Sequence, residues 1–121
     1  MENLEKINNE EEYKILFEQY CFLVEQEMQK TENDKSQKDH IRVATTLPKL
    51  ISCVNVIGYL RGQYFLDFRP PVSFQDELFL AEKEFENRLS QLIDYVKNSE
   101  SVNLYEQTLK EYYLKFRGLD Y

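Results

Sequence analysis

Apolar residues recur at every third or fourth position along four stretches of the chain, which is the spacing that lines up one face of an α-helix. Polar or proline-containing segments separate these stretches. The pattern therefore predicts an all-α fold, a small helical bundle of four main helices. We expect the helices at about residues 9–31, 47–68, 73–98 and 101–118.

The first of these helices has a strong start signal. Asn8 or Asn9 can cap it, and the run 10–12 places three glutamates at the positive end of the helix dipole. Its main stripe is Tyr13, Leu16, Phe17, Tyr20, Cys21, Val24 and Met28. Ile15, Phe22 and Leu23 lie off that stripe, so either the buried face is wide or a second surface is covered.

We predict a single domain over residues 1–121. Turn-forming residues within it indicate where the segments between the helices lie. Residues 31–39 contain no apolar side chain and are expected to form a polar loop, and residues 1–8 a flexible N-terminus. Thr45-Thr46-Leu47-Pro48 predicts a break with Thr46 as a new cap, and hence a short extra helix before Pro48. Residues 69–72 are expected to form a proline turn.

Segment 47–68 has two interpretations, because its β-branched residues and the pair Arg61-Gly62 also fit a hairpin over 51–66. Strict alternation fails at Cys53-Val54 and at Val56-Ile57, whereas a helical stripe is preserved, so we prefer the helix. Gly58 and Gly62 each weaken it by about 1 kcal/mol relative to Ala.

The last two helices are bounded by capping residues. Ser73, with Asp76 three positions later, has the spacing of a capping box, and Asn98 is a suitable end for that helix. Ser99 or Ser101 can cap the final helix, and Gly118 is expected to end it in a left-handed conformation.

Composition supports this fold class and constrains the partners. The chain has 121 residues, 42% of them hydrophobic, with only three Gly and three Pro, too few for the many turns of a β-sandwich. Its net charge is −7, and residues 1–30 hold eight acids against three bases. Such a surface disfavours direct binding to nucleic acid or membranes, and it either suits a basic partner or only maintains solubility.

The chain is expected to be cytoplasmic. Cys21 and Cys53 lie at apolar positions and are predicted to be reduced and packed in the core, and no secretory signal opens the sequence. The apolar stretch 50–68 carries Arg61 and Asp67, which a membrane span of about 20 residues would rarely combine.

Catalytic and metal-binding chemistry receives little support. His40 is the single histidine and borders the polar loop, so it cannot supply a multi-histidine metal site. The cysteines are far apart, and no glycine-rich phosphate loop is present. We therefore expect no enzyme activity, catalytic residue, cofactor, metal or small-molecule substrate, with a hydrolase or metal enzyme as the weakest hypothesis.

The leading functional hypothesis comes from segment 47–68, which is apolar nearly all round its helical wheel. Such a helix is either central or covered on its second face by another chain, although the segment 38–46 and the N-terminus are alternative covers. The hypothesis is a subunit, adaptor or inhibitor that binds another protein or its own copy. The candidate contacts are Tyr59, Arg61, Tyr64, Phe68, Arg69 and Tyr112.

A second hypothesis uses the Glu-rich first helix. An acidic decoy of this kind, or an immunity-type inhibitor, would block the nucleic-acid-binding groove of an enzyme, and its affinity would fall steeply with salt.

Overall fold

The computed structural model describes residues 10–119, apart from the side chains of residue 74 and of residues 115–119. Within that range the chain forms four helices and no strand, so the all-α prediction is confirmed. The helices are α1 (Glu10–Ser36), α2 (His40–Phe68), α3 (Val72–Lys97) and α4 (Val102–Leu119). Residues 51–66 are helical, so the hairpin interpretation was wrong. The proposed caps Asn8 and Asn9 lie outside the described residues.

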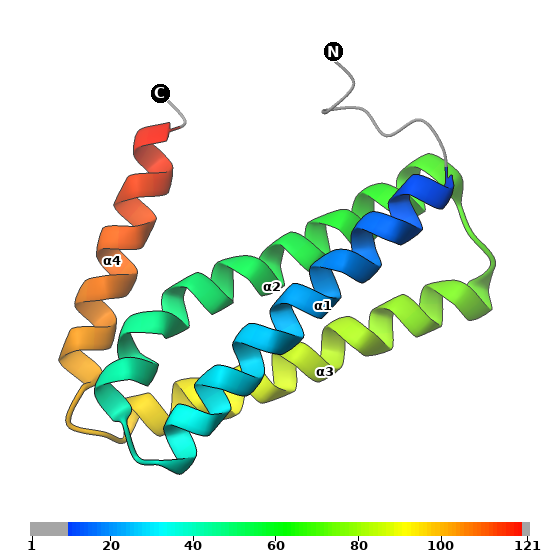
Figure 1. Ribbon diagram of the computed structural model, residues 1–121. Helices are drawn as coiled ribbons and strands as arrows, with labels where there is room; N and C mark the ends of the chain where they lie inside the picture. The colour runs from blue at the N-terminus through cyan, green and yellow to red at the C-terminus, as the bar shows by residue number, and fades with distance from the viewer. Residues whose placement is uncertain (1–9, 120–121) are drawn as a thin grey trace.

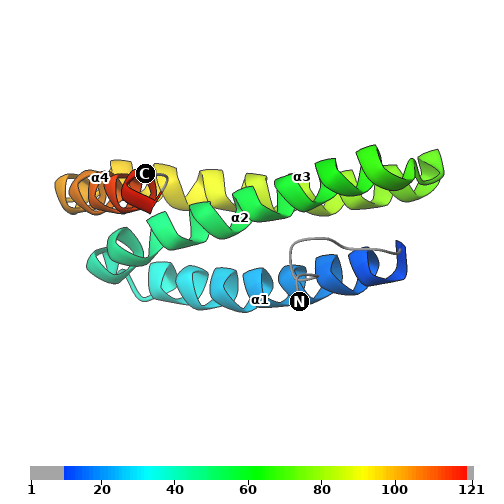
Figure 2. The same ribbon diagram turned by 90° about the horizontal axis from the view of Figure 1, so that it is seen from above.

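Helix α2 is the centre of the bundle. It runs alongside α1 and α3, and the first half of α4 packs against its beginning before the two helices diverge (Figure 1). Seen from above, α2 lies between α1 on one side and α3 with α4 on the other (Figure 2). Because α2 is covered on several sides, most of its apolar residues find partners within the molecule, while Ile41, Tyr59 and Leu66 remain exposed.

The polar segment predicted as a loop is mostly helical. Helix α1 continues to Ser36, and only Gln37–Asp39 form the turn, with Lys38 in the left-handed region at φ 59°. Thr31 is buried and its hydroxyl donates to the carbonyl of Glu27 at 2.8 Å, while Glu32 binds Arg88 of α3. The segment is therefore helical with a local hydrogen bond at Thr31 and a tertiary contact at Glu32, and composition alone could not indicate the tertiary contact.

The predicted break before Pro48 is absent, and no separate short helix precedes it. Helix α2 is continuous, and Pro48 is buried inside it. Val43, Leu47 and Leu50 are fully buried on both sides of the proline, so core packing outweighs the hydrogen bond that the proline ring removes. The hydroxyls of Thr45 and Thr46 both donate to the carbonyl of Arg42, rather than capping a new helix.

The start of α3 also differs from expectation. The helix begins at Val72 with Pro71 at the N-cap position, and no side chain caps it, so Ser73 is not the cap. Gln75 instead donates from Nε2 to the carbonyl of Pro70 at 2.6 Å. The predicted end is confirmed, because Asn98 is the C-cap.

Helix α4 begins directly after Ser101. The Ser101 carbonyl accepts the amide of Tyr105 at 2.9 Å, while its hydroxyl hydrogen-bonds His40 Nδ1 at 3.0 Å, so this side chain links α2 to α4 instead of capping α4. The helix continues through Gly118 to Leu119, and Gly118 has no positive φ. The predicted left-handed stop at this glycine was therefore wrong.

Cys21 and Cys53 are free thiols, partly buried against the core, as expected of small hydrophobic side chains. Burial, with a smaller contribution from the charge of Glu18, raises the pKa of the Cys21 thiol to about 11. Burial likewise raises the pKa of Cys53. Neither thiol therefore has the low pKa of a reactive cysteine.

By length and composition, α2 also passes as a membrane-crossing helix. An 18-residue window within it has a mean hydropathy of 1.4, and 39% of that window is buried inside the bundle. A central core helix has the same composition, so hydropathy does not distinguish the two situations.

Candidate interaction surfaces

Two of the six residues predicted to contact a partner belong to an aromatic cluster that joins the start of α1 to the end of α2. Tyr64 is only 2% exposed. Its ring stacks on Tyr13 with centroids 5.6 Å apart, and the rings of Tyr13 and Phe68 form an edge-to-face pair with centroids 5.4 Å apart. The Tyr64 hydroxyl donates to Glu10 at 2.6 Å and the Tyr13 hydroxyl to Asp67 at 3.0 Å. Tyr64 and Phe68 therefore hold two helices together, and the burial of Tyr64 leaves little of its side chain for a partner.

Arg61 is likewise occupied within the molecule. Its Nε donates to Glu82 of α3, and both side chains are largely buried. The guanidinium lies 5.4 Å from the ring centroid of Phe65 and 5.5 Å from that of Phe79, within cation–π range. The sequence suggested that Arg61 would either meet a carboxylate or reach a partner, and the structure assigns it to the carboxylate.

The other three predicted residues lie at or near the surface. Tyr59 is 65% exposed, and Arg69 is exposed at the turn after α2, with its backbone in the left-handed region at φ 47°. Tyr112 is half-buried in a crevice of about 140 Å³ between α2 and α4. Pro48, Ile51, Ser52, Asn55, Leu109 and Tyr113 also line it. Its volume is below the range of about 300–1,000 Å³ that is typical of small-molecule sites.

The six residues are thus divided among an interior cluster, a buried ion pair, an exposed position on α2, a turn and a crevice, and they do not form one surface. The apolar surplus of α2 is mostly core, with Tyr59 and the 72% exposed Leu66 as its large exceptions beyond the reach of α4. The central position of α2 in the bundle therefore explains most of the apolar residues around its helical wheel.

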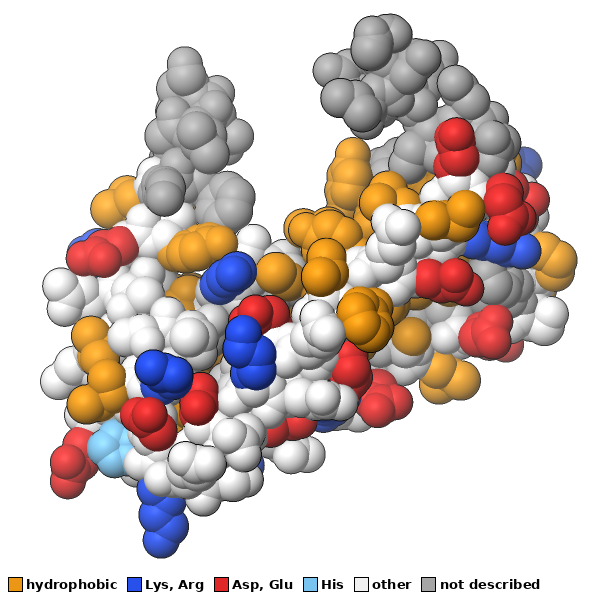
Figure 3. Space-filling view, in the orientation of Figure 1, with side chains coloured by type: hydrophobic (Ala, Val, Ile, Leu, Met, Phe, Trp, Pro, Cys, Tyr) orange, Lys and Arg blue, Asp and Glu red, His pale blue; other side chains and the backbone are white. Residues whose placement is uncertain are grey.

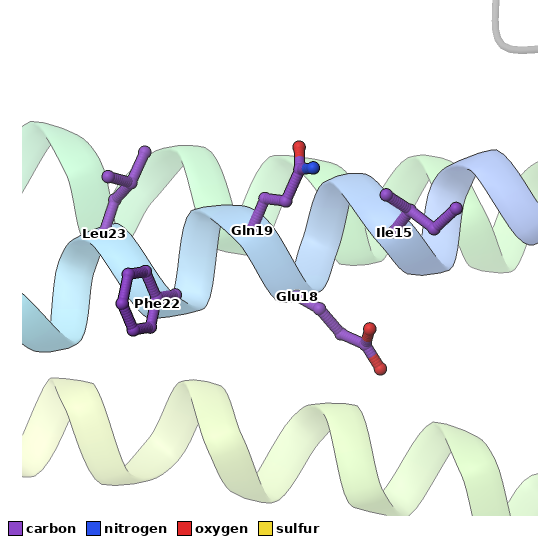
Figure 4. A pocket seen from close by; sticks show the side chains of 5 residues that line it. All are labelled: Ile15, Glu18, Gln19, Phe22 and Leu23. Carbon is purple, nitrogen blue, oxygen red and sulfur yellow. The ribbon is translucent and has the colours of Figure 1, made fainter.

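The outer face of α1 is the surface that the candidate list missed. Ile15, Phe22 and Leu23 are 46%, 62% and 55% exposed. Together with Glu18 and Gln19 they line a shallow depression of about 580 Å³, and all five side chains come from α1 alone (Figure 4). This outer α1 face, defined by these five residues, lies opposite the core stripe of Tyr13, Phe17 and Val24. The sequence already indicated this surface, because Ile15, Phe22 and Leu23 lie outside the main apolar stripe of the helix.

Carboxylates surround the outer α1 face near its N-terminal end. Residues 10–23 contain four glutamates and one lysine, and Glu11, Glu12 and Glu18 are exposed. In the space-filling view, acidic and apolar side chains lie next to each other over this part of the molecule (Figure 3). Farther along α1 the charges are compensated, since Arg88 binds both Glu25 and Glu32, and Lys30 pairs with Glu27 at 3.5 Å.

Groups for chemistry are sparse in the described part of the chain. Residues 10–119 contain no cluster of three or more His, Cys, Asp or Glu side chains that could hold a metal ion. The His40 imidazole is hydrogen-bonded to Ser101, and the hydroxyl of Tyr95 is buried with no hydrogen-bond partner within that same range.

No family model, no curated protein and no solved structure matches this chain.

Proposed function

We propose that this chain is a non-catalytic protein–protein interaction module, a small subunit, adaptor or inhibitor, that binds its partner through the outer α1 face. The observation that carries the proposal is the exposure of Ile15, Phe22 and Leu23 along one side of α1, on the surface turned away from the core. Large apolar side chains gathered in this way mark interaction sites more often than scattered single ones.

The energetic argument is that water contact with these three side chains is unfavourable. Full burial of a side chain such as Leu, Ile or Phe contributes about 1.5–3 kcal/mol each, and here roughly half of each remains to be buried. A partner that covers all three recovers a few kcal/mol, which is the scale of a small group of interface hot spots. The flanking glutamates then select which partners approach.

The surface first inferred from the sequence remains as a smaller, second contact region. Tyr59 and Leu66 of α2 are exposed, and Arg69 is exposed at the adjoining proline turn. A partner seated on this region would contact residues from one helix and one turn. We rank it below the outer α1 face because fewer of its apolar residues are clustered.

The acidic decoy for a nucleic-acid-binding enzyme is the alternative, favoured by the exposed carboxylates Glu11, Glu12 and Glu18 on the same helix. The two functions differ in which atoms carry the affinity. A decoy depends on the carboxylates and tolerates loss of the apolar side chains, whereas an interaction module of the kind proposed depends on Phe22 and Leu23.

The test is quantitative affinity purification from the native host with the Phe22→Ala, Leu23→Ala double variant. Its matched control is Leu80→Ala with Leu114→Ala, whose side chains are 66% and 56% exposed on α3 and α4. We expect a partner that is captured by the wild-type and control proteins and lost, at least tenfold, with the α1 variant. Identical partner sets for all three proteins would refute the proposal.

A further inference from the structure

The outer α1 face is shaped to accept an element that lies lengthwise along it. Ile15, Gln19, Phe22 and Leu23 follow the spacing i, i+4, i+7 and i+8, which places them on one strip parallel to the helix axis. At 1.5 Å per residue the strip from Ile15 to Leu23 is about 12 Å long. Another amphipathic helix is the element whose apolar side chains repeat with this geometry.

The charges around the strip indicate whether the partner helix is acidic or basic. The exposed Glu11, Glu12 and Glu18 border it, and the only base in residues 10–23 is Lys14. A helix that carries Lys or Arg beside its apolar face would place positive charge against these carboxylates, whereas an acidic helix would be repelled.

The same charges argue against a second copy of this chain as the occupant. Two outer α1 faces packed in parallel would place Glu11, Glu12 and Glu18 of one copy against the same residues of the other, and in either orientation both copies would bring their carboxylates to the interface. Like charges at an interface oppose association, and each copy carries a net charge of −7.

We infer that the outer α1 face binds a basic amphipathic helix of another protein, with Phe22 and Leu23 as apolar anchors and Glu11, Glu12 and Glu18 as the charged border. The inference rests on the proposed function and adds the chemical class of the partner. It requires both features together, since either the apolar strip or the acidic border alone would leave the partner unspecified.

The direct experiment measures binding of the full chain to three labelled synthetic peptides by fluorescence anisotropy. The first is a helix of about 18 residues with a leucine face and lysines elsewhere, long enough to be helical when bound. The second replaces lysine with glutamate, and the third scrambles the first so that its leucines form no stripe. We expect the first peptide to bind at least tenfold more tightly than either of the others, with affinity falling about tenfold between low and high salt.

Variants of the protein connect that binding to this face. Phe22→Ala with Leu23→Ala, and separately Glu11→Gln, Glu12→Gln and Glu18→Gln together, should each weaken binding of the first peptide at least tenfold. The matched charge control is the exposed α3 set Asp76→Asn, Glu77→Gln and Glu86→Gln, which changes net charge equally and should leave the affinity within about twofold.

Three outcomes would overturn the inference. They are equal binding of the scrambled peptide, equal weakening by the α3 control, or a dimer in light scattering that Phe22→Ala abolishes. Failure here is distinguishable from failure of the proposed function. If the native partner is still lost with Phe22→Ala and Leu23→Ala while no peptide binds, only the partner class is wrong.

Discussion

Two glycines on α2 show how much the surroundings of one residue decide its role. A Cβ added at Gly58 would lie 2.8 Å from Oε2 of Glu82, whereas a Cβ at Gly62 would meet nothing within 4 Å. Glu82 cannot move away without cost, because it is buried and accepts the hydrogen bond from Arg61. Gly58 therefore permits the close approach of α3, while Gly62 only weakens the helix.

Alanine at these two positions should consequently have opposite effects on stability. Gly62→Ala is expected to raise the free energy of unfolding by about 0.5–1 kcal/mol, which is the intrinsic helix preference for Ala. Gly58→Ala should lower it by about 1 kcal/mol, because displacement of Glu82 outweighs the same gain. Urea unfolding of both variants measures the difference. In a protein that already carries Glu82→Ala, adding Gly58→Ala should no longer lower the free energy of unfolding. If it still lowered that free energy, this explanation would be contradicted.

The tyrosine pair between α1 and α2 predicts an alkaline limit to stability. Burial and the hydrogen bond to Asp67 raise the pKa of Tyr13 from 10.0 to about 12, and burial with the bond to Glu10 raises the pKa of Tyr64. The folded state thus holds these protons more tightly than the unfolded state. Their contribution is fully present below pH 10 and is lost as the pH rises from 10 toward 12.

Tyr13→Phe tests this assignment because it keeps the ring and removes the titrating hydroxyl. Urea unfolding at a series of pH values should show a shallower fall above about pH 10 than in the wild-type protein, by as much as roughly 1 kcal/mol per pH unit. The exposed Tyr113→Phe on α4 serves as the control, because Tyr113 is not among the groups that raise the pKa of Tyr13, and this variant should leave the slope unchanged. Equal slopes for all three proteins would show that Tyr13 does not limit stability at alkaline pH.

Between elements, α1 and α3 are joined by a clamp centred on Arg88. Its guanidinium donates to Glu25 at 2.8 and 3.0 Å and to Glu32 at 2.8 and 2.9 Å. The two glutamates are seven residues apart, two turns along the same side of α1. The hydrogen bonds from Arg88 hold the pKa of the Glu25 carboxyl below its usual range, and they raise the pKa of Arg88.

Replacing Arg88 with Met should lower the free energy of unfolding by about 1–2 kcal/mol, discounted from a fully buried pair because Glu25 and Glu32 are partly exposed. The lowered pKa of Glu25 determines the direction in which this stabilisation changes with pH. The stabilisation is present above the ordinary pKa of glutamate, about 4.3, and is lost as the pH falls through the lower folded-state value. Acid titration of stability should therefore be shallower in Arg88→Met than in wild type. The exposed Lys97→Met is the matched control, and an equal effect there would argue against the clamp.

Periodicity predicted which stretches are helices, but it did not predict where they end. The polar run at Thr31 and Glu32 continues α1 because those side chains bond to Glu27 and Arg88, residues that lie elsewhere on the helix or on α3. Pro48 stays inside α2 because hydrophobic burial on both sides outweighs one lost hydrogen bond. Core burial at Pro48 and the Glu32–Arg88 contact are invisible to local signals, so the length of α1 and the continuity of α2 were missed. Local signals gave the end of α3 at Asn98 correctly but placed its cap at Ser73, whereas the N-cap position is Pro71.

At the scale of the molecule, the position of α2 explains why the candidate site was only partly predictable. A helix that is apolar all round is either enclosed or exposed on one side, and the sequence does not reveal how many neighbours surround it. Packing of α1 and α3 against the second half of α2 turned Arg61, Tyr64 and Phe68 toward the interior. The off-stripe residues of α1 were visible in sequence, yet their exposure depended on the fact that no helix within residues 10–119 packs against that side.

The same arrangement leaves α4 with the weakest attachment. Among its residues 102–114, Tyr105 is the one that is buried, and the helix diverges from α2 beyond the crevice lined by Leu109 and Tyr112 (Figure 1). A helix held by few buried contacts opens locally at lower free energy than the global unfolding free energy. Amide exchange should therefore be faster in α4 than in the middle of α2.

Tyr105→Ala should enlarge this difference without unfolding the bundle. Loss of the buried ring removes the main apolar contact of α4, so its amides should exchange at least tenfold faster, while those of α1, α2 and α3 change little. Hydrogen exchange followed by mass spectrometry measures this helix by helix, with the exposed Tyr113→Ala as the matched tyrosine control. A uniform acceleration across all four helices would mean that α4 is an integral part of one cooperative unit. Acceleration confined to α4 would establish that α1, α2 and α3 form the stable body that supports the outer α1 face.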